Sequence, residues 1–290
     1  MIEYEDSQNK AAILMEALPY VRRFRGSVFV VKYGGSFMDS PDPAVRSRVA
    51  QDLVFLNFVG IKVVVVHGGG KAVTKQLESR GLEAKFINGL RVTDASTIEV
   101  VDEVLNGKVN GEVVEFVSSY DCEVQRLPGK EILSCKKLYQ EPYLGFVGAI
   151  TKVDTAPIKE ALEDGLMPII SSTASDENGQ CYNVNADTVA AEIAISLGAR
   201  RLVYLSDVPG LLQNPEDSNS LLSSLPVDQV DSLKSEGIIA KGMLPKVNSA
   251  VDALNSGVNR VHFIDGRLPH SILLEIFTDE GIGTEIVHAS

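Results

Sequence analysis

Short runs of apolar residues alternate along the chain with stretches in which apolar side chains recur every three or four positions. The β-branched runs predict buried strands, at 28–31, 62–67, 168–170, 202–205 and 261–264. The stretches between them predict helices, so strand–helix–strand crossovers repeat along the chain. Such crossovers build a mainly parallel sheet with helices on both faces, and we therefore predict a three-layer αβα sandwich.

The middle of the chain departs from this pattern. Residues 123–180 are rich in glycine, proline and short apolar runs, and Asn178-Gly179 is a strong hairpin-turn signal. We expect hairpins there, on either side of a helix over 155–164. The change of pattern predicts three parts, which are an N-terminal helix over 1–26, an N-terminal lobe over 27–175 and a C-terminal lobe over 176–290.

The predicted N-terminal helix carries an apolar stripe of Leu14, Leu18 and Val21. Pro19 lies inside this helix and should kink it, because proline removes a backbone hydrogen bond. The stripe has two possible uses. It packs on the body of its own chain, or it pairs with the same helix of another subunit, and the sequence leaves both open.

Charge and composition narrow the class of function. The chain has 290 residues, of which 44% are hydrophobic, and a net charge of −12. This charge disfavours a nucleic-acid-binding protein, which needs a basic face to meet phosphates. No apolar run is long enough to span a bilayer, and the acidic start is unlike a targeting peptide. Three widely spaced cysteines favour a reducing compartment, so we expect a cytoplasmic protein, or a plastid one if the chain is a processed precursor.

Two glycine-rich turns follow predicted strands, at Lys32-Tyr33-Gly34-Gly35 and at His67-Gly68-Gly69-Gly70. Such turns let the backbone approach a ligand closely, and they aim N–H groups and helix N-termini at negative charge. Neither turn matches a Walker A loop or the G-x-G-x-x-G dinucleotide motif. Together with Lys32, a charged residue after four apolar ones, they predict a site for an anion.

Further polar residues lie where secondary structure alone does not need them. Lys246 falls near the start of a predicted helix, where a positive charge opposes the helix dipole. Asn185 is a predicted N-cap, and Asp187 follows it. A buried carboxylate at Asp187 would need cationic partners, which Lys32 and Lys246 would supply. Asn183 faces the same side of the chain as Asn185.

Arg91 and the histidines are less specific. Arg91 follows the turn Asn88-Gly89, and it either binds a carboxylate through two parallel hydrogen bonds or is an ordinary surface arginine. The histidines lack metal-ligand spacing, and His67 is better explained as structural than as catalytic. We find no serine or cysteine paired with a base as in nucleophilic catalysis.

These segments, in this order, resemble the amino acid kinase family, and within it the acetylglutamate kinases. The segments that carry the resemblance are the two glycine-rich turns, Asn88-Gly89-Leu90-Arg91-Val92-Thr93, Tyr182-Asn183-Val184-Asn185-Ala186-Asp187 and Gly242-Met243-Leu244-Pro245-Lys246. The resemblance implies the amino acid kinase fold. It also implies ATP-dependent phosphorylation of the side-chain carboxylate of N-acetyl-L-glutamate, a step of arginine biosynthesis.

The resemblance assigns roles by position. Lys32 and Lys246 match the family's transition-state stabilisers, and Asp187 matches the carboxylate that positions them. The residues that match acetylglutamate contacts are Gly69, Gly70, Arg91 and Asn183. Those on the nucleotide side are Gly34, Gly35, Asn185, Ser206, Asp207 and Met243. Mg²⁺ would come with the ATP and be held mostly by phosphate oxygens, with no metal ligand expected from the protein.

The two ends of the chain resemble the arginine-inhibited members, which form hexamers, as trimers of dimers, by interlacing N-terminal helices. The residues that match arginine contacts are His262, Glu275 and Gly281. The resemblance therefore implies a homohexamer inhibited by L-arginine. It also names a PII signalling protein as a candidate partner, because some members in photosynthetic organisms bind one.

Two alternatives stay open at this point. One is a sister enzyme, acetylaminoadipate kinase, whose substrate is one methylene longer; such a difference is worth only about 1–3 kcal/mol in discrimination. The other is a non-catalytic arginine-sensing module on the same fold, because fold alone does not fix function.

Overall fold

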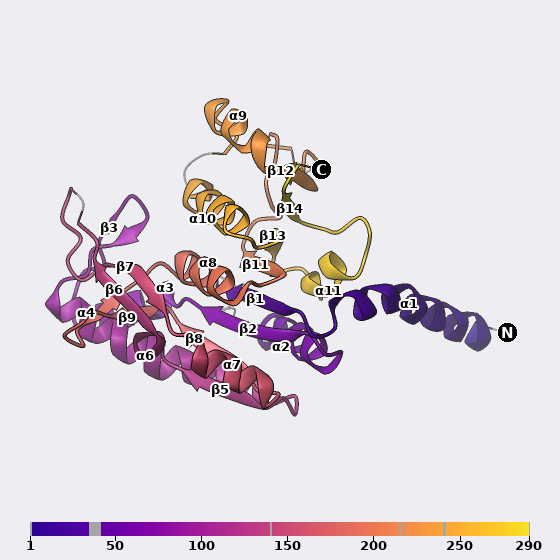
Figure 1. Ribbon diagram of the computed structural model, residues 1–290, viewed down its shortest axis with the longest axis horizontal. Helices are drawn as coiled ribbons and strands as arrows, with labels where there is room; N and C mark the ends of the chain where they lie inside the picture. The colour runs from indigo at the N-terminus through magenta and orange to yellow at the C-terminus, as the bar shows by residue number, and fades with distance from the viewer. Residues whose placement is uncertain are drawn as a thin grey trace.

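The computed structural model describes residues 2–34, 42–139, 141–214, 216–217, 219–239 and 242–289, and its helices and strands alternate as predicted (Figure 1). An eight-stranded sheet runs in the order β12-β14-β13-β11-β1-β2-β8-β5. Its strands are β1 (Val28–Tyr33), β2 (Lys62–His67), β5 (Val124–Leu127), β8 (Met167–Ser171), β11 (Arg201–Ser206), β12 (Ser224–Pro226), β13 (Arg260–Asp265) and β14 (Thr284–Val287). All neighbours pair in parallel except β13 with β14, so the predicted mainly parallel sheet is confirmed.

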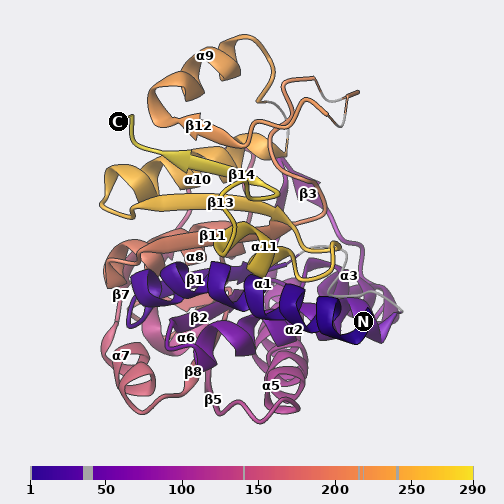
Figure 2. The ribbon, with the colours of Figure 1, turned by 90° about the vertical axis from the view of Figure 1, so that its right-hand side faces the viewer.

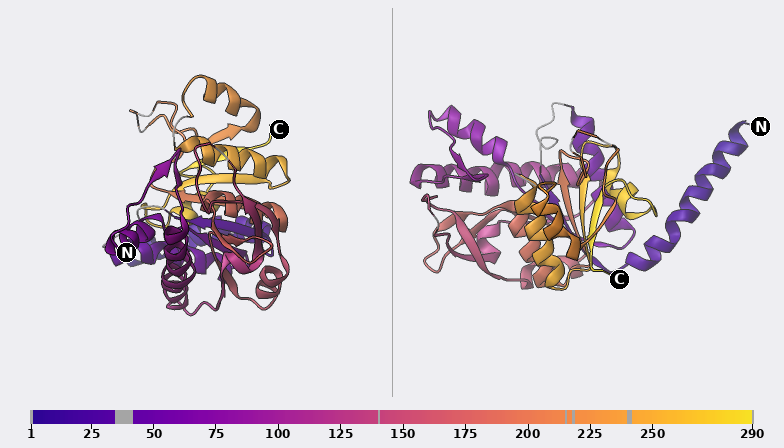
Figure 3. Two further views of the ribbon diagram at one scale, coloured as in Figure 1. Left: turned by 90° about the vertical axis from the view of Figure 1, so that its left-hand side faces the viewer. Right: turned by 90° about the horizontal axis from the view of Figure 1, so that it is seen from above.

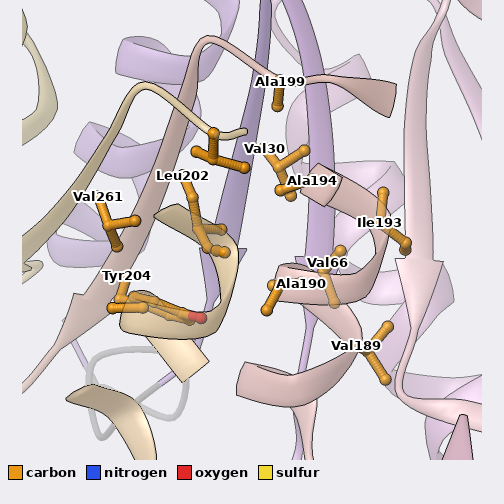
Figure 4. Packing of buried hydrophobic residues seen from close by; sticks show 14 of the residues in the cluster. Val30, Val66, Val189, Ala190, Ile193, Ala194, Ala199, Leu202, Tyr204 and Val261 are labelled. Carbon is orange, nitrogen blue, oxygen red and sulfur yellow. The ribbon is translucent and has the colours of Figure 1, made fainter. Parts of the chain in front are cut away.

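Helices cover both faces of this sheet, and the predicted three-layer sandwich is confirmed (Figures 1 and 2). One face packs against α2 (Pro43–Phe58), α3 (Gly70–Ser79), α4 (Ala95–Asp102), α5 (Asn110–Ser118) and α11 (Ser271–Ile276). The other packs against α7 (Ala156–Glu163), α8 (Ala186–Leu197) and α10 (Met243–Asn255). Because side chains alternate along a strand, Phe29 and Val31 enter one core while Val30 enters the other. Figure 4 shows this second core, where Val30 and Leu202 meet α8.

A second, smaller sheet of four strands lies beside the large one (Figure 1). Its order is β10-β9-β6-β7, built from β6 (Leu133–Lys137), β7 (Gly148–Val153), β9 (Thr173–Ser175) and β10 (Cys181–Asn183). The hairpin predicted at Asn178-Gly179 joins β9 to β10. A second hairpin, β3 (Phe86–Ile87) with β4 (Leu90–Arg91), turns through Asn88 at φ 51° and Gly89 at φ 81°, as a type I′ turn requires.

Short helices complete the chain, and none of them was predicted from the sequence. They are α6 (Gly129–Ile132), a 3₁₀ turn at Val227–Gln229 and α9 (Val230–Ser235). The π-helical turn η2 (Glu103–Val109) joins α4 directly to α5. The large sheet continues across residue 175, with β11 next to β1, so the division into an N-terminal and a C-terminal lobe stays a prediction.

Helix α1 (Ile2–Phe24) continues through Pro19 and extends away from the body (Figures 1 and 3). Leu14 is 70% exposed and Leu18 is 43% exposed, whereas Val21 and Phe24 pack on the core. Packing on the body of the same chain therefore accounts only for the last turns of α1. No helix in the described parts of the chain has the length and apolar character needed to cross a bilayer.

Candidate functional site

Two lysines share one buried carboxylate at the centre of the molecule. Lys32 lies near the carboxyl end of β1, Asp187 in the first turn of α8 and Lys246 in the first turn of α10. The Lys32 Nζ lies 3.1 Å from Asp187 Oδ1, and the Lys246 Nζ lies 2.7 Å from Asp187 Oδ2. The side chains of Lys32 and Asp187 are only 10% and 11% exposed. Three residues far apart in the sequence thus form one ionic cluster.

Electrostatics keep this cluster charged against its burial. Burial alone would raise the pKa of the Asp187 carboxyl, but the ammonium groups of Lys32 and Lys246 outweigh it and lower that pKa. Burial lowers the pKa of Lys32, and Asp187 opposes this shift. Gly34 is part of the arrangement, since a Cβ added there would clash with the Nζ of Lys32. Two positive charges and one negative charge leave the cluster net positive.

The second glycine-rich turn borders a cavity of about 250 Å³ beside this cluster. The turn follows β2, and α3 begins at Gly70, so that the N-terminus of α3 opens at the turn. Gly69 has φ +155°, and a Cβ on it would lie 2.7 Å from Leu105 Cδ2. Only glycine fits at this point, because the turn passes directly over η2. Lys32, Gly34 and Gly68–Gly70 all line the cavity.

Arg91 lines the same cavity. Its Nη2 donates to Gly70 O at 2.7 Å and to Thr74 Oγ1 at 2.9 Å. The guanidinium also stacks over the ring of Phe86, with its central carbon 4.6 Å from the ring centroid. Nη1 is buried and has no hydrogen-bond partner among the described residues. Arg91 is therefore not a surface arginine, and it brings a buried donor without a described partner to the wall of the cavity.

Asn183 and Asn185 complete the wall of the cavity. The Asn183 amide donates from Nδ2 to Thr93 Oγ1 at 3.3 Å, and both asparagines line the cavity. Asn185 caps α8 as predicted, since its side chain accepts from the Asp187 N–H at 2.8 Å. All four residues predicted to contact acetylglutamate lie together here: Gly69, Gly70, Arg91 and Asn183.

The residues predicted for the nucleotide side are more spread out. Gly34 and Asn185 line the cavity just described, and Gly35 lies outside the described residues. Ser206 and Asp207 lie at the carboxyl end of β11, where the carboxylate of Asp207 acts electrostatically on Lys32. Met243 begins α10. A second cavity, of about 870 Å³, runs from Asn185 and Asp187 to the start of α10 and has room for a larger ligand.

Comparison with known proteins places the chain in a family. A sequence profile described as the amino acid kinase family matches residues 27–265. The chain belongs to the amino acid kinase family. An acetylglutamate kinase from Syntrophomonas wolfei subsp. wolfei is 47% identical over 284 residues, which cover 97% of this chain and 98% of that protein. An acetylglutamate kinase from Clostridioides difficile is 46% identical over 279 residues, or 96% of each chain.

A solved structure also resembles this amino acid kinase. N-acetylglutamate synthase from Neisseria gonorrhoeae, complexed with coenzyme A and N-acetyl-glutamate, gives a TM-score of 0.85 at 26% identity, covering 97% of this chain and 64% of that chain. Its complex with coenzyme A and L-arginine gives 0.82 at 27% identity, covering 97% and 66%. This amino acid kinase thus spans about two thirds of the synthase.

A third cavity, of about 200 Å³, lies between α1 and the C-terminal part of this amino acid kinase, and it contains all three residues predicted to bind arginine. Glu275 Oε1 lies 2.7 Å from His262 Nδ1, and its Oε2 accepts the N–H groups of Ile282 and Gly283 at 2.8 Å. Burial would raise the pKa of Glu275, but these partners lower it, so the carboxylate stays charged. Gly281 packs against this carboxylate, since a Cβ there would lie 2.8 Å from Oε2.

The rest of this third cavity carries charged side chains of both signs, two of which, Arg260 and Glu285, form an ion pair. Cationic side chains from α1, β11 and β13 line it, namely Arg23, Arg201 and Arg260. Acidic side chains from the C-terminal segment also line it, among them Glu275, Asp279 and Glu285. Such a cavity suits a small molecule that carries both a carboxylate and a cation.

Several residues of the site were missed by sequence reasoning. Thr74 and Phe86 hold Arg91, and Thr93 accepts from Asn183 while donating to Arg91 O at 2.9 Å. Thr93 lies inside a segment that carried the family resemblance, yet its contact with Asn183 is long-range and leaves no local pattern. Asn110 on α5 contacts His67, which lies next to the glycine turn. Two asparagines four residues apart in an apolar helical stretch, Asn106 and Asn110, were the signal that could have pointed there.

Proposed function

We propose that this chain transfers the γ-phosphoryl group of ATP to the side-chain carboxylate of N-acetyl-L-glutamate, giving N-acetyl-L-glutamyl 5-phosphate for arginine biosynthesis. The observation that carries the proposal is the convergence of Lys32, Lys246 and the unpartnered Nη1 of Arg91 on one region of the molecule. The relatives named acetylglutamate kinase, which match 96% and 97% of the chain, support it.

The chemistry requires positioning and positive charge more than acid–base catalysis. A carboxylate acceptor is already ionised at neutral pH, so no general base is needed. The phosphoryl group in transfer carries negative charge on its oxygens, and fixed cations stabilise it. One lysine about 4 Å from that charge contributes on the order of 4 kcal/mol at an effective dielectric near 20. We assign this role to Lys32 and Lys246, with Asp187 as the carboxylate that positions both ammonium groups.

The 250 Å³ cavity is the proposed acetylglutamate site. Arg91 would bind a substrate carboxylate through Nη1, which otherwise remains a buried donor without a partner. The N–H groups of Gly69 and Gly70 and the amide of Asn183 are the further proposed contacts. Apolar side chains such as Leu105 line the same cavity and suit the acetyl group.

ATP with Mg²⁺ is the phosphoryl donor that the family implies. We place its phosphates beside Gly34 and the two lysines, where a net positive cluster meets a backbone without a side chain. Asn185, Ser206, Asp207 and Met243 are assigned to the nucleotide side, together with Gly35. Bound Mg²⁺ supplies charge neutralisation on the phosphate oxygens.

A coupled assay that follows ADP release tests the function. We expect turnover with acetylglutamate, and much less with acetylaminoadipate or with no acceptor. Lys32→Ala and Lys246→Ala should each lower kcat roughly 100-fold or more while changing the KM for acetylglutamate far less. Lys75→Ala removes an exposed lysine from α3 and should leave kcat nearly unchanged. Faster turnover of acetylaminoadipate favours the sister enzyme, and arginine binding without turnover of either acceptor favours the sensing module.

We further propose that the chain forms a hexamer inhibited by L-arginine, through the cavity that contains His262, Glu275 and Gly281. Two observations support this proposal. Tyr20, Arg23 and Phe24 of α1 line that cavity, so the helix is part of the effector site. The earlier turns of α1 expose Ile13, Leu14 and Met15, whose side chains are 64–70% exposed and suit a helix from another subunit.

Deleting residues 1–25 tests assembly and inhibition together. The truncated protein should be an active dimer with little sensitivity to arginine, by light scattering and by the coupled assay. A truncated protein that stays hexameric and is inhibited as strongly as the full chain contradicts both parts. A cytoplasmic location, a PII partner and lobe boundaries near residues 26 and 175 stay predictions of the sequence.

A further inference from the structure

The π-helical turn η2 places two buried asparagines against the ends of two adjacent strands. Asn106 lies within η2 and accepts from Ser171 Oγ at the end of β8 and, at 3.0 Å, from Thr173 Oγ1 at the start of β9. Asn110 lies one turn later, is fully buried, and reaches the end of β2. Arg126 donates to the backbone carbonyl of Asn106, inside the π-helical turn. The π-helical turn and the residues after it therefore place the hydrogen-bonding side chains of Asn106 and Asn110 against the strand ends next to the site.

Asn110 makes two hydrogen bonds through one nitrogen. Its Nδ2 donates to His67 Nε2 at 2.9 Å and to Ile169 O at 3.1 Å. The carbonyl of Ile169 fixes the orientation of this amide, because the opposite orientation would bring two oxygen acceptors together. His67 Nε2 must therefore accept a hydrogen bond, so it carries no proton.

The state of His67 follows from this contact. With Nε2 unprotonated, the ring proton is on Nδ1, which lies 2.8 Å from Gly68 O and donates to it. Burial lowers the pKa of His67 to about 4, so the ring stays neutral at neutral pH. His67 is fully buried between Asn110 and the glycine-rich turn.

The bond from His67 to Gly68 O fixes a second group of the same peptide. The C=O of Gly68 and the N–H of Gly69 belong to one planar trans peptide, and they point in opposite directions. Anchoring the oxygen on the imidazole therefore aims the Gly69 N–H away from the ring. On its other side the turn rests on Leu105 of η2, which leaves Gly69 little freedom to rotate.

We propose that His67, held in one tautomer by Asn110, is a positioning residue that aims the Gly69 N–H into the acetylglutamate cavity. This inference rests on the proposed function, in which Gly69 contacts the substrate. His67 touches neither substrate nor nucleotide, and it acts through the backbone of the turn.

Four single variants test the proposal in the full chain. Asn110→Leu keeps the size of the side chain and removes the donor to Nε2. His67→Asn places an amide N–H near the position of Nδ1, whereas His67→Gln places one near Nε2. Val113→Ala is the matched control, because Val113 is a buried residue of α5 that lies three residues beyond Asn110 and lines a separate cavity. Thermal midpoints are measured for all four.

We expect Asn110→Leu to lower kcat about 10- to 100-fold, since small displacements of a positioned donor have effects of that size. His67→Asn should retain more of the wild-type kcat than His67→Gln. Val113→Ala should keep kcat near wild type even if its thermal midpoint falls as far as that of Asn110→Leu. Equal kcat in Asn110→Leu and Val113→Ala, or a higher kcat in His67→Gln than in His67→Asn, overturns the proposal.

A spectroscopic measurement keeps the proposal testable if a variant does not fold. Long-range ¹H–¹⁵N spectra of ¹⁵N-histidine-labelled wild-type protein should show His67 as the neutral tautomer protonated on Nδ1. A proton on Nε2, or a doubly protonated ring near pH 7, overturns the proposal. The spectrum does not depend on enzyme activity. If the wild type does not turn over acetylglutamate, the proposed function is refuted, and the tautomer of His67 is still decided by the spectrum.

Discussion

Replacing Asp187 with asparagine tests whether this carboxylate keeps Lys32 charged. Burial and Lys246 lower the pKa of this ammonium group, whereas Asp187 and, to a smaller extent, Asp207 raise it. Asparagine has almost the same shape as aspartate but carries no charge. Asp187→Asn therefore removes the larger of the two negative charges that favour the charged lysine, and it leaves the burial and the Lys246 charge that oppose it.

The geometry gives the size of the effect. Two unit charges 3.1 Å apart attract by roughly 5 kcal/mol at an effective dielectric near 20. About 1.4 kcal/mol corresponds to a tenfold change in a protonation equilibrium. Losing this attraction lowers the pKa of Lys32 beyond the lowering that burial and Lys246 already cause. Because the charged lysine is the active form, kcat of Asp187→Asn should fall as pH rises, whereas wild-type kcat should stay level on the alkaline side.

The assay measures kcat at saturating ATP and acetylglutamate from about pH 6 to about pH 9. The double variant Asp187→Asn/Lys32→Arg is the control, because an arginine keeps its charge up to a pH of about 12. Its kcat should be low but without the alkaline decline. Parallel profiles for wild type and Asp187→Asn would refute the argument. A decline that persists in the double variant would show that Lys32 is not the group that titrates.

Three further predictions follow from single contacts. Arg91→Lys keeps the charge but loses the planar donors, so the KM for acetylglutamate should rise while the KM for ATP stays within about twofold; an unchanged acetylglutamate KM would place Arg91 outside the site. Gly34→Ala should displace the Lys32 ammonium and lower kcat about tenfold or more without lowering the thermal midpoint, and normal turnover would contradict the close packing there. Burial raises the pKa of Asp52 from 3.8 to about 6, so the folded state binds more protons in this window and stability falls as pH rises through it. Between about pH 4.5 and about pH 7.5, the free energy of unfolding measured in urea should fall by on the order of 2 kcal/mol more for the wild type than for Asp52→Asn. Equal falls in the two proteins would contradict this assignment.

Most of the fold could be predicted from local pattern. The runs that became β1 and β2 are apolar over several successive residues, which only strands buried on both faces require. The π-helical turn was missed because the residues from 103 to 109 keep an apolar helical pattern, and the extra residue in the turn has no local signature. Whether α1 packs on its own chain could not be decided from its stripe, because both uses require the same side chains.

The ionic cluster was predictable because each charge conflicts with its local structure. Lys32 ends an apolar strand, and Lys246 opposes a helix dipole, so both positions indicate a function that secondary structure does not supply. The contacts of Thr93 and Asn110 could not be predicted in the same way. Each joins residues more than 40 positions apart in the sequence, and such pairs are defined only once the chain has folded.

Helix α1 lines the proposed effector cavity with its last turns and exposes apolar side chains on its earlier turns. On the proposed assembly, one element therefore takes part in two equilibria, the binding of arginine and the pairing of subunits. Coupling between two binding events is reciprocal. If bound arginine changes the affinity between the subunits by some factor, pairing of the subunits changes the affinity for arginine by the same factor. Sensitivity to arginine then depends on enzyme concentration: dilution weakens inhibition, and added arginine drives dilute subunits together.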